Sequence, residues 1–188
     1  MDKGVKGLGW GKPKAWRVTD RDTMTELSLE ARKRQQEIIA KIRKIPGCET
    51  AFAARTSPDL TIRRGRCITC DYAISADDVK SGRHFDDDVL AYGFSDSSAP
   101  IGGGGGSFGI PYRALCAANI ENLLVSGMMI TWEVHAFQST RNTVSCMAQG
   151  QAAGTAAALC AAGNCMTRDL KYPALRKALR DGGVYLKG

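Results

Sequence analysis

The stretch Gly150-Gln-Ala-Ala-Gly154 removes side chains from one stripe of a segment that is otherwise rich in alanine. Such a stripe can meet another backbone or a flat ligand at short range. If the segment is a helix, its start at Thr143 to Cys146 offers free backbone N–H groups and the positive end of the helix dipole to a negative charge or a carbonyl oxygen. The pattern therefore fits either close packing of a helix on a sheet or contact with a flavin, which carries a pyrophosphate and ring carbonyl groups.

The segments around this stripe read as a buried strand and two helices. Residues 141–162 contain eight alanines and no charge beyond Arg141, which predicts a buried helix in very close contact with its neighbours. The short apolar run 121–127, ended by Gly127, predicts a buried strand, and a polar loop should join it to the helix. Gly163-Asn164 should end the helix, and a last short helix is expected over 168–181.

The earlier part of the chain predicts one long helix and a small sheet. Leu27, Ala31 and Ile38 lie at helical spacing, so a helix is expected over residues 25–44, ended by Pro46-Gly47. Residues 50–100 predict a small antiparallel sheet with short strands at 60–62 and 67–74, and the capping pattern of 75–78 predicts a helical turn. The five glycines 102–106 are typical of a flexible linker or of a backbone that passes close to a ligand. The chain as a whole is expected to be of mixed α/β class.

Cysteine and histidine give weaker signals. Cys67-Ile-Thr-Cys70 has the spacing of half a zinc or iron–sulfur site or of a redox pair. No second C-x-x-C follows, and a strand would point alternate side chains apart, so no metal site is predicted. The chain has two histidines: His84, in a turn, is expected to face solvent, and His135 lies in the loop before the alanine-rich helix.

Charge is distributed unevenly along the 188 residues. The net charge is +7, but residues 1–66 hold 16 of the 26 basic and 8 of the 19 acidic side chains. A basic third can contact nucleic acid, an anionic ligand or an acidic partner chain. Interleaved aromatics and a known nucleic-acid module are missing, which argues against nucleic acid. No apolar run could cross a membrane and no export signal is seen, so a cytoplasmic protein with reduced thiols is expected.

Several motifs resemble one family. The runs IPYRAL, NLLVSGMMIT, STRNTVSCMAQGQAAGTAAALCAAG and LRKALRDGGVYL are similar to the C-terminal half of FAD-dependent oxidoreductases related to the fumarate reductase and glutathione reductase flavoproteins. The upstream runs EARKRQQEIIAKIRKIPGCETA, Arg63-Arg64 and SADDVKSGRHF agree in order, so the resemblance covers about residues 20–188. It implies an FAD cofactor, a small-molecule substrate, and a Rossmann-like FAD domain built from both chain ends with a substrate domain inserted between them.

The resemblance also implies how the chain is divided. Residues 1–22 would be an irregular basic arm that docks a partner, 23–115 a helix with part of the substrate domain, and 116–188 the C-terminal portion of the FAD-binding domain. The family opens with a strand, a G-x-G-x-x-G turn and a helix. No such strand–turn–helix unit occurs here, because the glycine run lies late and is not followed by a helix start. If the chain begins at Met1, a second polypeptide is expected to bring the N-terminal FAD-binding half.

Site residues carried over from the family fall into two groups. Those expected to contact FAD are Arg63, Arg64, Gly127, Arg141, Cys146, Met147, Gly150, Gln151 and Gly154. Those expected to move a proton are His135 first, then Tyr112 and Glu133. Many relatives carry Thr-His-Glu where this chain has Thr131-Trp132-Glu133. The chain is therefore expected to be a catalytic oxidoreductase subunit, and the alternative is a non-catalytic assembly or regulatory subunit.

Overall fold

The computed structural model describes residues 19–58, 60, 65–93, 106–130 and 133–187, without the side chains of residues 134 and 135. The chain forms two compact units, Met1–Gly65 and Arg66–Gly188, and each is described by itself. This division into two units shows only which residues pack together. The assignment of 1–22, 23–115 and 116–188 to parts of a flavoprotein stays a prediction.

The first unit consists mainly of helix α1, Arg21–Ile42. Asp20 caps it by accepting a hydrogen bond of 2.8 Å from the backbone N–H of Thr23, and Gly47 adopts φ +84° shortly after its end. The helix predicted over 25–44 is thus confirmed, with an earlier start set by the Asp20 cap. Among the described residues, no side chain of α1 is buried, so the helix has little tertiary support from its own unit.

The second unit is built around a two-stranded antiparallel sheet of β1, Asp88–Tyr92, and β2, Phe108–Pro111. Leu90 pairs with Ile110, and the register shifts between Asp88 and Leu90. The Asp88 carboxylate lies directly against Gly109, where an added Cβ would come within 2.2 Å of all three carboxylate atoms. Only glycine at position 109 leaves room for the Asp88 carboxylate to lie against β2.

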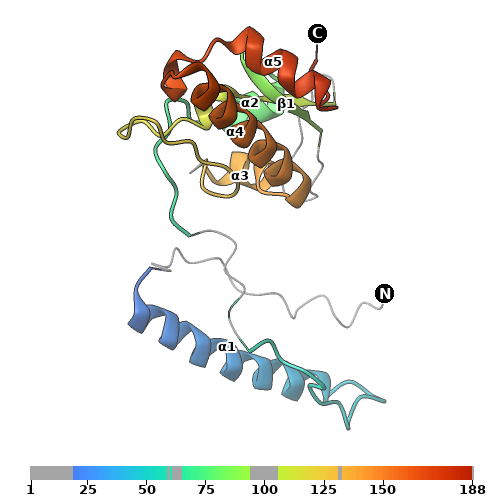
Figure 1. Ribbon diagram of the computed structural model, residues 1–188. Helices are drawn as coiled ribbons and strands as arrows, with labels where there is room; N and C mark the ends of the chain where they lie inside the picture. Colours follow the sequence, from blue (N-terminus) through green and yellow to red (C-terminus); the bar gives the residue numbers. More distant parts are fainter. Residues whose placement is uncertain (1–18, 59, 61–64, 94–105, 131–132, 188) are drawn as a thin grey trace. The chain divides into compact units, whose positions relative to one another are not determined.

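Within the described residues of this unit, four helices and two 3-10 turns accompany the sheet; helices α2 to α5 are labelled in Figure 1. Helix α2, Ala76–Ser81, begins with a reciprocal capping box between Ser75 and Asp78, which confirms the predicted helical turn. Helix α4, Thr143–Gly163, confirms the alanine-rich helix and packs against both β1 and α5, Tyr172–Asp181. Helix α3, Val134–Thr140, contacts α2. The 3-10 turns η2 and η3 span Tyr112–Ala114 and Thr167–Asp169.

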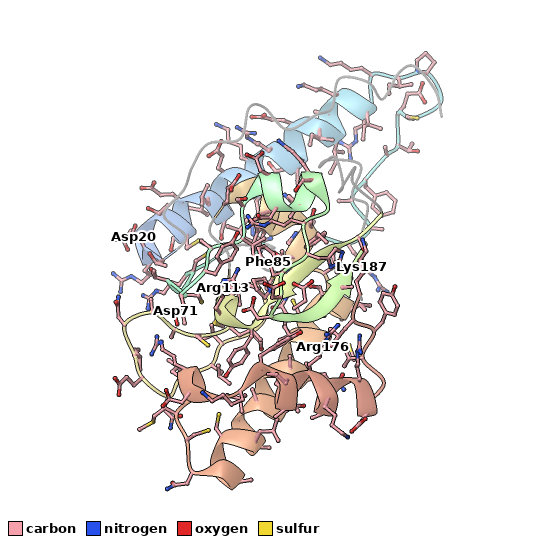
Figure 2. All side chains as sticks on the ribbon, turned by 90° about the horizontal axis from the view of Figure 1, so that it is seen from above. Asp20, Asp71, Phe85, Arg113, Arg176 and Lys187 are labelled. Atoms are coloured by element: carbon pink, nitrogen blue, oxygen red, sulfur yellow. The ribbon has the colours of Figure 1, made fainter. Side chains whose placement is uncertain are left out.

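The core of this unit joins both strands to one face of α4 and α5. Its fully buried aliphatic and aromatic side chains include those of Val89, Phe108, Ile110, Leu115, Ala152, Ala156, Leu175 and Leu179. Above the sheet, the Arg113 guanidinium carbon lies 5.1 Å from the Phe85 ring centroid, and the two side chains are neighbours in Figure 2. Arg113 also pairs with Asp87, which ties the segment after β2 to the turn before β1.

Two predicted strands are wrong. Residues 67–74 form no strand and contribute one isolated bridge, Cys70 to Ala117. Residues 121–127 form turns, with Leu124 bridging Cys116. The second run is apolar but too short to pair over its length, and its first residues 121–123 are exposed. Residues 61 and 62 of the strand predicted at 60–62, and most of the glycine run, lie outside the described residues.

The predictions for three helices need correction. The helix expected over 168–181 is divided into η3 and α5, because Pro173 fits only in the first turn of a helix and disfavours helical backbone before it. The polar loop predicted between Gly127 and the alanine-rich helix instead contains helix α3. Helix α4 is not buried all round, since the face opposite its core residues is exposed. The mixture of helices with a small sheet confirms the mixed α/β class, and no described helix is long and apolar enough to span a membrane.

Candidate functional site

The turn at Gly127 is fixed to helix α4 by one buried side chain. Gly127 adopts φ +89°, which favours glycine, and its N–H donates to Gln149 Oε1 at 2.7 Å. The Gln149 amide nitrogen donates to the Thr140 carbonyl at 3.1 Å and to Ser145 Oγ at 3.0 Å. Gln149 is fully buried. Its hydrogen bonds therefore join the Gly127 turn, the end of α3 and the first turns of α4 in one arrangement.

Cys146 and Arg141 lie beside this turn. A Cβ built on Gly127 would lie 4.0 Å from Cys146 Sγ, and the Cys146 thiol donates to the Arg141 carbonyl at 3.3 Å. Burial raises the pKa of the Cys146 thiol, so the group is held protonated. The Arg141 side chain donates from Nε to Gln138 Oε1 at 3.0 Å. The structure thus brings three of the predicted cofactor residues, Gly127, Arg141 and Cys146, to one place.

The start of helix α4 lacks a side-chain cap. Asn142 occupies the N-cap position without a capping hydrogen bond, and its amide instead donates to the Gln138 carbonyl at 3.3 Å. Thr143 and Val144, in the first turn, are exposed. Backbone N–H groups at an uncapped helix start, together with the helix dipole, favour an anion or a carbonyl oxygen. The geometry supports the prediction of a polar ligand at this helix start.

An exposed stripe runs along α4 away from the core. Its members recur at spacings of three and four residues, carry no charge, and are Val144, Met147, Gln151, Gly154 and Ala158. A Cβ added at Gly154 would meet nothing within 4 Å, and one at Gly150 would meet only Ser126 Oγ at 3.9 Å. The interpretation that these glycines serve close packing on this chain's own sheet is therefore wrong. Three predicted cofactor residues, Met147, Gln151 and Gly154, share the stripe.

The other predicted residues are placed as follows. Tyr112 is buried, donates to the Thr167 carbonyl at 2.8 Å, and has its pKa raised well above the ordinary value by burial. Glu133 accepts a hydrogen bond of 2.8 Å from the Ala76 N–H at the start of α2. His135 lies in the first turn of α3, and its side chain is outside the described part of the chain, as are Arg63 and Arg64. The proton-transfer roles stay predictions.

Sequence reasoning missed two other side chains near the site. Besides Gln149, Tyr92 lies at the end of β1 with its phenol hydrogen-bonded to the Asn142 side chain. Burial is the main cause that raises the pKa of Tyr92, and the nearby Cys146 is a second, smaller cause. No motif in the sequence singled out Tyr92. Its position beside α4 depends on how β1 packs against that helix.

The expectation that His84 faces solvent is wrong. His84 Nδ1 lies 2.8 Å from Asp88 Oδ2, and Nε2 lies 3.2 Å from Ser107 Oγ. The ring is only 18% exposed. His84 therefore links the turn before β1 to the residue that precedes β2.

The two cysteines of the C-x-x-C pair differ in exposure, since Cys70 is buried and Cys67 is of intermediate exposure. Cys70 is buried, and burial is the main cause that raises its pKa to about 11, with Cys116 and Asp71 as further causes. A thiol with this pKa stays protonated at neutral pH, whereas metal binding needs the thiolate. Among the described residues, no group of three or more histidine, cysteine or acidic side chains could hold a metal ion.

These features define a mixed α/β protein in which an uncapped helix start lies beside a glycine turn. A family model for FAD dependent oxidoreductases matches residues 8–179. The match covers most of the chain, so the chain belongs to the FAD dependent oxidoreductase family and its cofactor is FAD. No curated protein and no solved structure matches the chain.

The residues present fit this cofactor. The open start of α4 can face an electron-rich or anionic group of FAD, and Gly127 allows the backbone to approach a ligand without a side chain in the way. Gly154 leaves space on the exposed stripe that any larger residue would fill. The string Gly104 to Gly109 has the spacing of a dinucleotide-binding turn, but its last two residues already belong to strand β2, and no helix starts there.

Proposed function

We propose that this chain is a subunit of a heteromeric FAD-dependent oxidoreductase, in which residues 116–188 form the C-terminal portion of the FAD-binding domain and residues 23–115 include part of the substrate domain. A partner chain supplies the strand–turn–helix unit with G-x-G-x-x-G. Together the two chains complete the cofactor site and the cavity for a small organic substrate, whose oxidation or reduction proceeds by hydride transfer.

The observation that carries this proposal is the exposed stripe of α4. Its outer face is uncharged and mostly apolar, and the exposed side chains of Val144 and Met147 would gain from being buried by a surface outside the chain. Within this chain nothing lies within 4 Å of a Cβ at Gly154. The space in front of Gly154 can therefore hold a surface outside the chain. In this proposal that surface is FAD or the N-terminal half of the FAD-binding domain.

The chain's own residues have separate tasks in this proposal. FAD, when bound, supplies the two-electron chemistry. The N–H groups of Thr143 and Val144 orient a carbonyl or anionic group at the start of α4. Gln149 holds the Gly127 turn in place, because its amide oxygen accepts from the Gly127 N–H while both amide hydrogens are donated to Thr140 and Ser145. His135 transfers the proton that accompanies hydride movement, from its position one helix before the site.

The experiment is purification of the tagged full chain from the organism that encodes it, followed by native mass spectrometry and flavin absorbance. We expect a complex that contains FAD and a second polypeptide bearing a strand, a G-x-G-x-x-G turn and a helix. The chain produced alone should be colourless, because it lacks the phosphate-binding turn. A yellow, stable monomer produced alone would contradict the proposal.

A second candidate function is supported by the segment before α3. Trp132 stands where the pattern of the family that this sequence resembles has histidine, and the Glu133 carboxylate accepts a hydrogen bond from the Ala76 N–H. Both features suit a subunit that keeps the fold without proton chemistry. A purified complex that holds FAD at full occupancy, with a partner that contributes every group needed for turnover, would favour this assembly role.

A further inference from the structure

The carboxyl end of helix α4 places two cysteines in a specific helix-ending motif. Asn164 adopts the left-handed conformation at φ +47°, the Cys165 N–H donates to the Cys160 carbonyl at 3.0 Å, and the Asn164 N–H donates to the Ala161 carbonyl at 3.4 Å. This pair of hydrogen bonds is the Schellman motif, in which the side chains at the positions of Cys160 and Cys165 meet each other. The backbone thus directs the two thiols together.

Side-chain contacts agree with this placement. The Cys160 thiol is hydrogen-bonded to Cys165. Burial is the larger cause that raises the pKa of Cys160, and this hydrogen bond raises it further. Cys160 Sγ also lies 3.7 Å from the Met166 carbonyl, to which it donates. Disulfides join cysteines whose Cα atoms lie about 4.4–6.8 Å apart, and a direct backbone hydrogen bond keeps the two residues within reach of each other.

A groove gives small molecules access to the pair. It has a volume of about 760 Å³ and is lined by both cysteines, by Ala153 and Ala157 of α4, and by Asn122 and Leu124 of the facing loop. This volume is in the range of small-molecule sites, about 300–1,000 Å³. Cys165 is the more exposed of the two thiols, whereas Cys160 is only 4% exposed. A reagent in the groove therefore meets Cys165 first.

The geometry points to Cys160 and Cys165 as a reversible dithiol–disulfide site that reacts with low-molecular-weight disulfides of the glutathione type. Cys165, as the thiolate, attacks one sulfur of oxidised glutathione, so the S–S bond breaks and one glutathione leaves with a proton. Cys160 then loses its proton and attacks Cys165 Sγ, which releases the second glutathione. The two protein thiols are oxidised by two electrons, and oxidised glutathione is reduced to two thiols.

The disulfide changes the rim of the groove. Cys160 loses the proton that it donates to the Met166 carbonyl, and the turn through Gly163 and Asn164 becomes covalently closed. Oxidation is thus expected to alter the groove without unfolding α4, because the Schellman hydrogen bonds are made by the backbone.

The test is equilibration of the full chain, and of the assembled complex, with excess oxidised glutathione, followed by alkylation and peptide mass mapping. We expect more than half of the chains to carry a Cys160–Cys165 disulfide that dithiothreitol reverses. The variant C160S should retain one glutathione on Cys165, and C165S should leave Cys160 unmodified because it is buried. The matched control C146S, altered in the same helix, should form the disulfide as the parent does.

Circular dichroism of each variant shows whether its helices are intact. Free, alkylated Cys160 and Cys165 in folded parent chain under excess oxidised glutathione would overturn the proposal. So would a disulfide that joins either residue to a different cysteine.

Discussion

Asp78 is a buried carboxylate whose ionised form is held by several hydrogen bonds. Burial raises its pKa, but hydrogen bonds from the Ser75 N–H and hydroxyl, Tyr72 and Arg83 outweigh burial, and the net pKa is lowered. A carboxyl with a lowered pKa in the folded state stabilises the fold above its ordinary pKa. That contribution is lost as the pH falls through the folded-state value.

We therefore expect Asp78→Asn to lower the free energy of unfolding by about 1–3 kcal/mol at pH 7. The difference from the parent should shrink at acidic pH, below the ordinary carboxyl pKa, because the protonated parent then resembles the amide. Thermal unfolding of the full chain between pH 7 and pH 2 measures this. Asp77→Asn, an exposed neighbour in the same helical turn, serves as the control and should have little effect. An equal loss for Asp78→Asn at every pH would show that its charge is not the cause.

His135 and His84 should respond differently to substitution. In the assembled complex, His135→Ala should keep the flavin spectrum and slow turnover by about 10²–10⁴-fold if His135 transfers a proton. His84→Ala should instead lower the melting temperature, because it removes the link between Asp88 and Ser107. Turnover and melting curves of both complexes make the comparison. Unchanged turnover in flavin-loaded His135→Ala complex would leave Tyr112 and Glu133 as the remaining candidates.

At the scale of single residues, the sequence predicts the role of a residue when its partners lie close to it along the chain. The capping box of Ser75 and Asp78 is such a case, since both partners lie within four residues. Gln149 and His84 each have one partner four residues away, Ser145 and Asp88. Their other partners, Gly127 and Ser107, are 22 and 23 residues away, and those contacts are not local. A glutamine or histidine carries no sign of such a partner, so its burial is known only once the elements are packed.

Helix α4 has two faces with opposite expected responses to larger side chains. Ala152 is fully buried against the sheet side, whereas Gly154 faces open space. In the chain alone, Ala152→Leu should destabilise the fold by about 1–3 kcal/mol through overpacking. Gly154→Leu should leave stability equal or raise it by up to about 1 kcal/mol, because glycine is a poor helix former.

In the assembled complex, Gly154→Leu should lower FAD content, because the leucine fills the space that the proposed partner or cofactor occupies. Thermal unfolding of the chain and flavin absorbance of the complex measure the two effects separately. Full FAD occupancy of the Gly154→Leu complex would show that the exposed stripe contacts neither FAD nor the partner chain.

At the scale of elements, prediction succeeds where local signals are complete. Helices α1, α2 and α4 follow from apolar spacing, caps and composition. The run 121–127 was predicted as a strand because an apolar stretch before glycine suits one, but a strand needs a neighbour to pair with along its length, and Leu124 finds one bridge partner only. The true strands β1 and β2 are joined across a glycine-rich stretch, so their pairing is not a local property of either segment.

The two compact units of the chain differ in how well their helices are supported. Helix α4 buries five side chains, whereas no side chain of α1 is buried among the described residues. Isolated helices with little tertiary packing are marginal in water. Residues 1–66 also carry the excess of basic side chains, which suits an acidic surface on the proposed partner chain.

Hydrogen exchange of the whole molecule should reflect this difference. In the chain alone, amides of Arg21–Ile42 should exchange much faster than those in the middle of α4, because α1 opens without exposing a core. In the assembled complex, exchange across α1 should slow if the proposed partner covers this helix, and added salt should reverse part of that slowing because the contact is partly ionic. Peptide-resolved exchange of the chain and of the complex, at low and high salt, measures this. Equal protection of α1 and α4 in the chain alone would show that α1 is already supported within its own unit, and the basic segment would then need no partner to stabilise it.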